Sequence, residues 1–286
     1  MTISSARTVD DLLTISPFDG LSAASRQRLR EGVRLVSYGE GQLLSSAEAI
    51  GDQVLVLLEG TARLLAERDG VPFTLERLQN GAIIGLASLL RAQGCEQVNA
   101  ATALLAVAIP DALILQLLQV EPPLRRWCAQ QLWTAELHAL MTLRQPAQSA
   151  GRFDAGVWRQ QLEDLRPLAR AVAPEALAER PAGADEDLVL ASANVPDLPL
   201  GSVLPADRPL PQPRPPLPLR LVILPRLEDS VPTVYPEVLA GVDGDVEGLP
   251  VPGRPPQPSS LDLGQNNRSR GLQLIRARGP LDETLA

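Results

Sequence analysis

The sequence predicts a mainly β fold with flanking helices: an antiparallel β-roll of the jelly-roll or cupin-like kind, followed by a Pro-rich extended or disordered tail. Short apolar runs alternate with glycine-containing turns between residues 33 and 110. Segments with helical periodicity lie before and after that region. Of the 27 prolines, seven lie at or before Pro167 and the other 20 follow it, which predicts a compact first half and an extended second half.

The N-terminal segment, residues 8 to 32, has two helical stretches. Thr8–Leu13 and Ser22–Glu31 both combine helix formers with polar starts. The turn Ser16–Leu21 between them carries the apolar anchors Phe18 and Leu21.

The roll is predicted from a series of short apolar runs. They are Val33–Tyr38, Gln42–Leu44, Gln53–Leu58, Thr61–Ala66, Phe73–Leu78 and Val98–Ile109. Asp69-Gly70 is a good hairpin turn because glycine accepts positive φ. Turn signals at a spacing of about 8–12 residues favour a roll or barrel.

Helical periodicity returns over Leu113–Leu143, where Pro122-Pro123 predicts a short helix, a break and a longer helix. A second helical candidate is Asp154–Ala171. We therefore divide the chain into a domain at 1–146, a helical segment at 147–182 and an extended linker or tail at 183–286.

The tail contains Pro209–Pro218, which must be extended because each proline fixes φ and removes a donor. It also contains small apolar islands that could add as strands to another body, at 187–191, 220–224 and 272–275. Alone they cannot bury enough apolar surface to offset chain entropy.

Composition excludes several classes of function. The net charge of −8 argues against a nucleic-acid partner, because phosphate binding needs a basic face. Without lysine the chain cannot carry a Walker-type ATP-binding loop. Two cysteines are too few for a disulfide framework, and no apolar run reaches the roughly 20 residues that span a bilayer. We expect a cytoplasmic protein without direct membrane insertion.

The stretch Gly81-Ala-Ile-Ile-Gly85-Leu-Ala-Ser-Leu-Leu90 resembles the phosphate-binding cassette of the cyclic-nucleotide-binding-domain family. The helix, β-roll, helix order of residues 8 to 143 resembles that family too, as do Gly41 and Gly60. The resemblance implies that a helix N-terminus and an arginine hold the cyclic phosphate, while a glutamate following the cassette glycine accepts from the ribose hydroxyl.

The cassette departs from this pattern at both side chains. Leu86 stands in place of the glutamate, and Gln97 or Val98 in place of the arginine. The candidate ligand-binding residues are Gly85, Leu86, Ala87, Ser88 and Arg91, the last displaced in sequence from the expected arginine. They predict a weak anion site, so no cofactor is assigned and a cyclic nucleotide is disfavoured.

Two patches are similar to a narrower group, the regulatory domains at the front of bacterial ABC exporters that carry a leader peptidase. They are Ser88–Arg91 with Gly94–Glu96, and the closing segment 274–286. This similarity implies a protein partner, the exporter or its peptidase module, at the inner face of the membrane. The predicted function is regulatory or docking; a working cyclic-nucleotide sensor and a free-standing scaffold are the alternatives.

No residue set predicts catalysis or metal binding. His138 is the single histidine, and it cannot form a His-based metal cluster with two distant cysteines. Cys128 is ten residues away on the same predicted helix, too far for a nucleophile pair, and nothing in the sequence supports a pair with Cys95. We therefore do not expect an enzyme. Ile114, Leu118 and Trp133 could pair helices of two copies or serve as monomer core, and both interpretations stay open.

Overall fold

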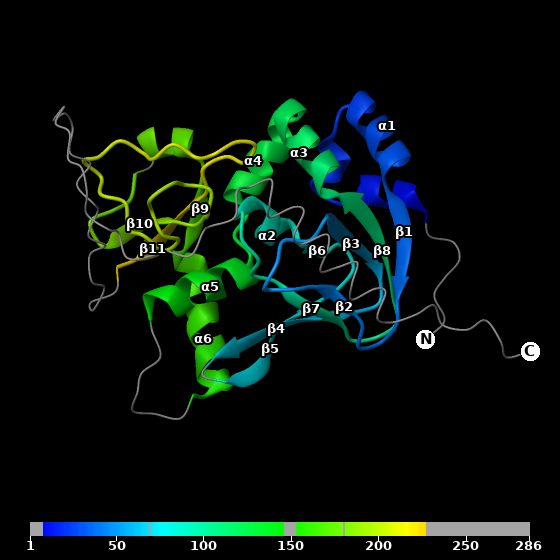
Figure 1. Ribbon diagram of the computed structural model, residues 1–286, viewed down its shortest axis with the longest axis horizontal. Helices are drawn as coiled ribbons and strands as arrows, with labels where there is room; N and C mark the ends of the chain where they lie inside the picture. The colour runs from blue at the N-terminus through cyan, green and yellow to red at the C-terminus, as the bar shows by residue number, and fades with distance from the viewer. Residues whose placement is uncertain (1–7, 69, 146–152, 180, 227–286) are drawn as a thin grey trace, which may run out of the picture. The chain divides into compact units, whose positions relative to one another are not determined.

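The structure is a computed structural model that describes residues 8–68, 70–145, 153–179 and 181–226 (Figure 1). All of them lie in the compact unit Met1–Pro232. The predicted apolar island at 272–275 and the closing segment 274–286 lie outside the described residues.

The predicted antiparallel β-roll is confirmed as two four-stranded sheets. Its strands are β1 (Arg34–Tyr38), β2 (Leu43–Ser45), β3 (Gln53–Glu59), β4 (Ala62–Arg68), β5 (Val71–Leu78), β6 (Ile83–Ile84), β7 (Gln97–Ala100) and β8 (Leu104–Pro110). The sheet orders are β1-β8-β3-β6 and β2-β7-β4-β5. The run expected over Val98–Ile109 is divided, because β7 belongs to one sheet and β8 to the other.

The chain leaves the first sheet after β3 at a corner that requires glycine. Gly60 has φ +86°, and a Cβ there would lie 2.5 Å from the carbonyl oxygen of Ala103. A side chain would therefore clash with the backbone where the two sheets approach each other.

The core lies on both faces of β3. Leu55 and Leu57 belong to the apolar cluster inside the roll, while Val54, Val56 and Leu58 belong to a second cluster shared with the helices. Successive side chains of a strand point to opposite faces, so a continuous apolar run serves two clusters at once.

Helical segments precede and follow the roll, as predicted. They are η1 (Val9–Thr14), η2 (Phe18–Gly20), α1 (Ala23–Gly32), α3 (Asp111–Val120), α4 (Pro122–Gln130), α5 (Thr134–Arg144) and α6 (Ala155–Leu165), with the short turns η3 (Arg166–Leu168) and η4 (Pro174–Ala178). The cassette helix α2 (Leu86–Leu90) lies within the roll sequence. No helix of the described residues is long and apolar enough to cross a membrane.

The longer helix predicted after Pro122-Pro123 is divided into α4 and α5. The side chain of Arg220 donates to the carbonyl oxygens of Cys128 at 3.0 Å and Gln131 at 2.6 Å. Because the last carbonyls of a helix lack intrahelical partners, this arginine satisfies the end of α4. The partner lies about ninety residues along the chain, so local periodicity does not reveal the break.

A three-stranded sheet follows the helices. It consists of β9 (Arg170–Val172), β10 (Glu186–Leu190) and β11 (Leu221–Pro225), in the order β10-β11-β9. Its buried side chains form one cluster with those of α5 and α6; the members include Leu140, Trp158, Val189, Val222 and Leu224.

This sheet corrects the expectation of an extended chain throughout the described part of 183–286. The islands at 187–191 and 220–224 coincide with β10 and β11, which find their missing apolar partners on α5 and α6. The division of the chain into domains at 146 and 182 stays a prediction.

Candidate functional site

The predicted cassette is a short turn of helix between β6 and β7. Gly85 precedes α2 with φ +88°, the left-handed conformation that glycine adopts at no steric cost. Four of the predicted residues, Gly85, Leu86, Ala87 and Ser88, are consecutive here, and every residue of α2 is buried.

The N-terminal end of α2 is occupied by a side chain of the same chain. One carboxylate oxygen of Glu96 accepts from the Gly85 N–H at 3.1 Å. The other accepts from the N–H and hydroxyl of Ser88 at 3.0 and 3.1 Å. The Ser88 hydroxyl in turn accepts from the Cys95 N–H at 3.1 Å. An internal carboxylate thus holds the amides that the family resemblance assigns to a phosphate.

Glu96 is deeply buried, with 4% of its surface exposed. Burial raises the pKa of its carboxyl above the usual 4.5, the hydrogen bonds from Ser88 and Gly85 act in the opposite direction, and the nearby Glu136 raises the pKa further. The N–H and O–H donors therefore stabilise the charged form of the Glu96 carboxyl, whereas burial and Glu136 destabilise it.

Glu96 was not identified as a site residue from the sequence, although the alternating pattern around it was visible there. The strand β7 buries Val98 and Ala100 in alternation, and Glu96 lies two residues before Val98 on the same face. A carboxylate on the buried face of a strand needs donors, and the adjacent helix N-terminus provides them.

Arg91 follows the last residue of α2, at the opposite end of the helix from Gly85. Its side chain is 1% exposed, and its Nε donates to the carbonyl oxygen of Ala191 at 3.2 Å. The Ala193 N–H donates to the backbone oxygen of Arg91 at 2.8 Å. This predicted site residue thus joins the cassette to the chain that leaves β10.

The positions that the resemblance assigns to the phosphate arginine have other contacts. The Gln97 side chain accepts from the Ala47 N–H at 3.2 Å, and Val98 is fully buried inside the roll. Neither side chain supplies a cation to the cassette.

The remaining candidate groups do not assemble into a reactive site. His138 accepts from the Trp158 indole N–H at 3.0 Å through Nδ1, and Cys128 lies in the helical core. Burial raises the pKa of the Cys128 thiol to about 12 and that of Cys95 to about 11, which keeps both sulfurs protonated at neutral pH. Across the described ranges, no three His, Cys, Asp or Glu side chains could hold a metal ion.

One known protein family matches the part of the chain that contains the cassette. The model of the cyclic nucleotide-binding domain matches residues 35–121, from β1 to the end of α3. This segment is therefore similar to cyclic nucleotide-binding domains. The match includes the cassette and leaves α4 to α6 and the C-terminal sheet outside the family model. No curated protein matches the chain.

Several solved structures are similar to part of this chain. A putative cyclic nucleotide-binding protein from Geobacter metallireducens GS-15 shares 19% identity at TM-score 0.37, over 42% of this chain and 88% of that one. The regulatory domain of Toxoplasma gondii PKA, solved with cAMP, shares 16% at TM-score 0.37, over 42% and 46%. A cAMP-binding acyltransferase from Mycobacterium smegmatis shares 23% at TM-score 0.36, over 46% and 41%. The last two are matched over less than half of their length, and likeness at this level says nothing about what this chain binds.

Proposed function

We propose that this cyclic nucleotide-binding domain is a regulatory or docking module whose cassette does not accept a cyclic phosphate. The observation that carries the proposal is the Glu96 carboxylate at the N-terminus of α2, bonded to both Gly85 and Ser88. It satisfies the donors that a phosphate would need.

Electrostatics support the proposal. A phosphate entering beside Glu96 would meet a like charge; two unit charges about 4 Å apart repel by about 4 kcal/mol at an effective dielectric constant of about 20. To bind, the ligand would have to expel the carboxylate. Arg91 lies at the other end of α2, where its Nε donates to Ala191.

The test is a thermal-shift series on the full chain with cAMP, cGMP, cyclic dinucleotides and inorganic phosphate. A ligand at 100 times its Kd would stabilise the fold by about 2.7 kcal/mol, which is a shift of roughly 5–11 °C for a protein of this size. We expect no shift for the wild type. A shift with one cyclic nucleotide would instead identify a working sensor, the alternative that the family match favours.

A variant at Glu96 tests whether its carboxylate is what excludes the phosphate. Glu96→Ala frees the amides of Gly85 and Ser88, so we expect it to gain a shift with inorganic phosphate if it retains the wild-type circular dichroism spectrum. Glu40→Ala is the matched control, because Glu40 is an exposed carboxylate.

We further propose that the partner is a peptidase-containing ABC exporter or its peptidase module. The support is the similarity of Ser88–Arg91 and Gly94–Glu96 to that group. Co-purification of the tagged full chain with such an exporter from the same genome tests it. Absence of a complex would favour the free-standing scaffold. The location at the inner face of the membrane and the absence of enzymatic activity stay predictions.

Pairing of two copies through Ile114, Leu118 and Trp133 receives no support. Ile114 and Leu118 are buried in the helical core, and Trp133 packs against it. This burial supports the monomer-core interpretation of these side chains.

A further inference from the structure

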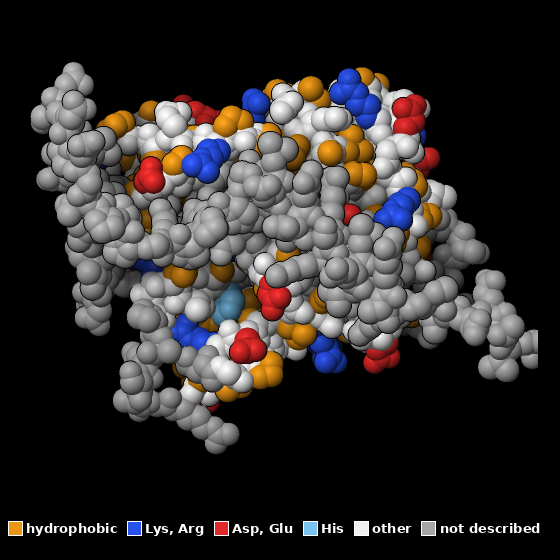
Figure 2. Space-filling model, viewed as in Figure 1, with side chains coloured by type: hydrophobic (Ala, Val, Ile, Leu, Met, Phe, Trp, Pro, Cys, Tyr) orange, Lys and Arg blue, Asp and Glu red, His pale blue; other side chains and the backbone are white. Residues whose placement is uncertain are grey.

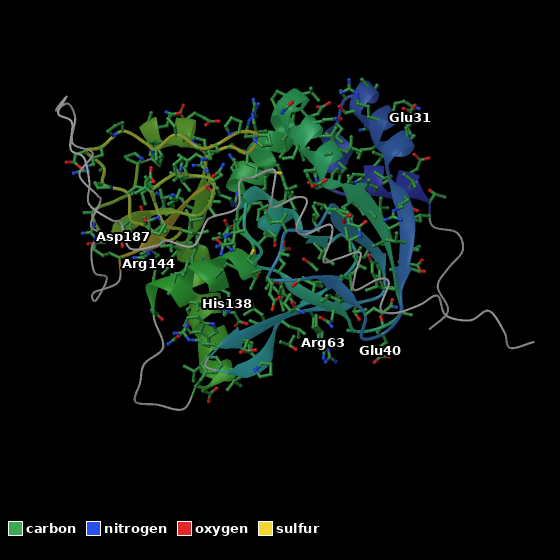
Figure 3. All side chains as sticks on the ribbon, viewed as in Figure 1. Glu31, Glu40, Arg63, His138, Arg144 and Asp187 are labelled. Atoms are coloured by element: carbon green, nitrogen blue, oxygen red, sulfur yellow. The ribbon has the colours of Figure 1, made fainter. Side chains whose placement is uncertain are left out.

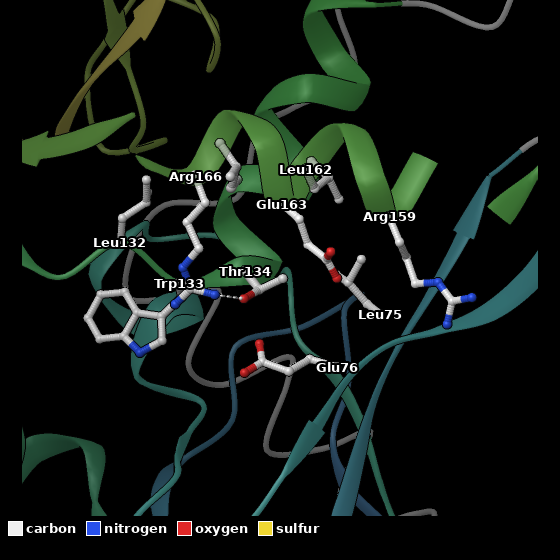
Figure 4. Close-up of a pocket in the computed structure, with 10 residues that line it drawn as sticks. Leu75, Glu76, Leu132, Trp133, Thr134, Arg159, Leu162, Glu163 and Arg166 are labelled. Atoms are coloured by element: carbon white, nitrogen blue, oxygen red, sulfur yellow. Dashed lines mark hydrogen bonds between the residues drawn. The ribbon is translucent and has the colours of Figure 1, made fainter. Parts of the chain in front are cut away.

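A cavity of about 250 Å³ opens between β5 and the helices α5 and α6 (Figure 4). Its floor is apolar, formed by Leu75, Leu132, Leu137 and Leu162, and its rim carries charged groups of both signs. Arg166 reaches toward Trp133 and donates to the Thr134 hydroxyl at 2.8 Å. The cavity lies outside the cassette and shares no lining residue with it.

A second hollow of about 460 Å³ continues from the first along β5. The two share Leu75, Glu76 and Arg159, so they form one groove. We call this the β5 groove; its second half is lined by Arg63, Thr74, Leu75, Glu76, Arg77 and Arg159.

The second half of the β5 groove concentrates positive charge. It carries three arginines and one glutamate on a chain whose net charge is −8. Arg63 and Arg77 are exposed and directly opposite each other across β4 and β5. Figure 3 shows Arg63 projecting from the outer face of the sheet. Like charges in this register repel, and neither arginine has an ion-pair partner among the described residues.

The strand beside the groove is at the edge of its sheet. β5 ends the order β2-β7-β4-β5, so one side of its backbone faces away from the other strands. The Thr74 carbonyl on that side accepts only a long bond, 3.4 Å, from Arg159. An edge strand of this kind can align an extended chain beside it.

We propose that the β5 groove binds an extended acidic segment of a partner protein. Its carboxylates pair with Arg63, Arg77 and Arg159, and one apolar side chain enters the cavity floored by Leu75 and Leu162. The positive charge of the groove favours an acidic peptide as the ligand. The apolar floor favours a peptide over a nucleic acid, because a sugar-phosphate backbone has no apolar side chain to fill it. The inference rests on the proposed docking function and names the chemistry of its partner.

Fluorescence polarisation on the full chain tests the proposal. The probe is a fluorescein-labelled peptide that alternates Asp or Glu with Leu; one companion peptide replaces the acids with Lys, and another replaces Leu with Ser. We expect the acidic probe to bind, with affinity that falls as salt rises, and both companions to bind at least tenfold more weakly. The serine companion tests the apolar floor without altering the protein.

Variants locate the binding. Arg63→Glu with Arg77→Glu should weaken the acidic probe at least tenfold, whereas Arg126→Glu, an exposed arginine on α4, should leave it within about twofold. Equal binding of the lysine peptide, no effect of the double variant, or tighter binding of a single-stranded oligonucleotide would overturn the proposal. A cyclic-nucleotide shift in the thermal series would leave this result unchanged, so the two proposals fail separately.

Discussion

At the scale of single residues, His138 is held in its neutral form. It accepts from Trp158 and lies edge-on to Phe73, while Arg68 stacks over Trp158 with its guanidinium carbon 3.8 Å from the ring centroid. Burial and, to a smaller extent, the charge of Arg68 lower the pKa of His138 from 6.5 to about 4. The imidazole, pale blue in Figure 2, is therefore part of a packed aromatic cluster.

The titration of His138 can be measured directly, because it is the single histidine. We expect its NMR resonance to titrate with a midpoint near the lowered pKa of about 4. Since the folded pKa lies below the unfolded value of 6.5, its contribution to stability is complete above pH 6.5 and is lost as the pH falls toward 4. His138→Gln should remove that part of the pH dependence; a midpoint near 6.5 would contradict the structure.

Glu96 contributes to the pH dependence of stability with the opposite sign to His138. Its folded pKa is raised above 4.5, so protonation is favoured in the folded state and its contribution to stability is lost as the pH rises through that window. The free energy of unfolding of the wild type minus that of Glu96→Gln should therefore decrease as the pH rises from 4.5. Urea unfolding of both proteins measures it, and His138 cancels in the difference. A flat or rising difference would contradict the raised pKa of Glu96.

At the scale of elements, the helix pair α4–α5 and the strand β11 are joined by a buried ion pair. Arg220 donates to both carboxylate oxygens of Glu136 at 2.5 and 2.6 Å, and it lies 5.0 Å from the ring centroid of Trp133. Glu136 is fully buried and Arg220 is 5% exposed. Removing one member leaves an uncompensated charge in the interior.

Arg220→Met should therefore lower the free energy of unfolding by about 3–5 kcal/mol, and adding Glu136→Leu should recover part of that loss. Urea unfolding of the single and double variants measures the coupling. Arg226→Met is the control: its pair with Asp187 is half exposed, and we expect a loss below about 1 kcal/mol. If the double variant lost the sum of both single effects, the pair would not be coupled.

At the scale of the whole molecule, the chain around the C-terminal sheet is connected to the cassette and to α5 at several points within Met1–Pro232. Arg91 bonds to Ala191, Arg220 bonds to Glu136, and Arg144 of α5 forms an ion pair with Asp187 of β10 (Figure 3). The sheet also covers the apolar side of α5 and α6.

Ending the chain at residue 182 should consequently destabilise the rest. It removes Val222 and Leu224 from their cluster and leaves Glu136 without its arginine. Losing buried side chains costs about 1–5 kcal/mol each, against a total stability of about 5–15 kcal/mol. We expect a lower or absent cooperative thermal transition by circular dichroism, while a chain ending at Pro232 unfolds in one transition. An unchanged Tm would mean that the roll is stable without the sheet.

The sequence by itself determined the β-roll, its flanking helices and the place of the cassette, because alternation, glycine turns and helical periodicity are local signals. Gly85 to Ser88 are consecutive, so their proximity also followed from the sequence; their role in binding stays a prediction. Only the tertiary structure decided that Glu96 holds the end of α2, that Arg91 turns toward Ala191, and that Arg220 ends α4. These contacts join residues that are distant in the chain or depend on which face is buried. For the same reason β10 and β11 became strands only where α5 and α6 supplied the apolar surface that their own segments lack.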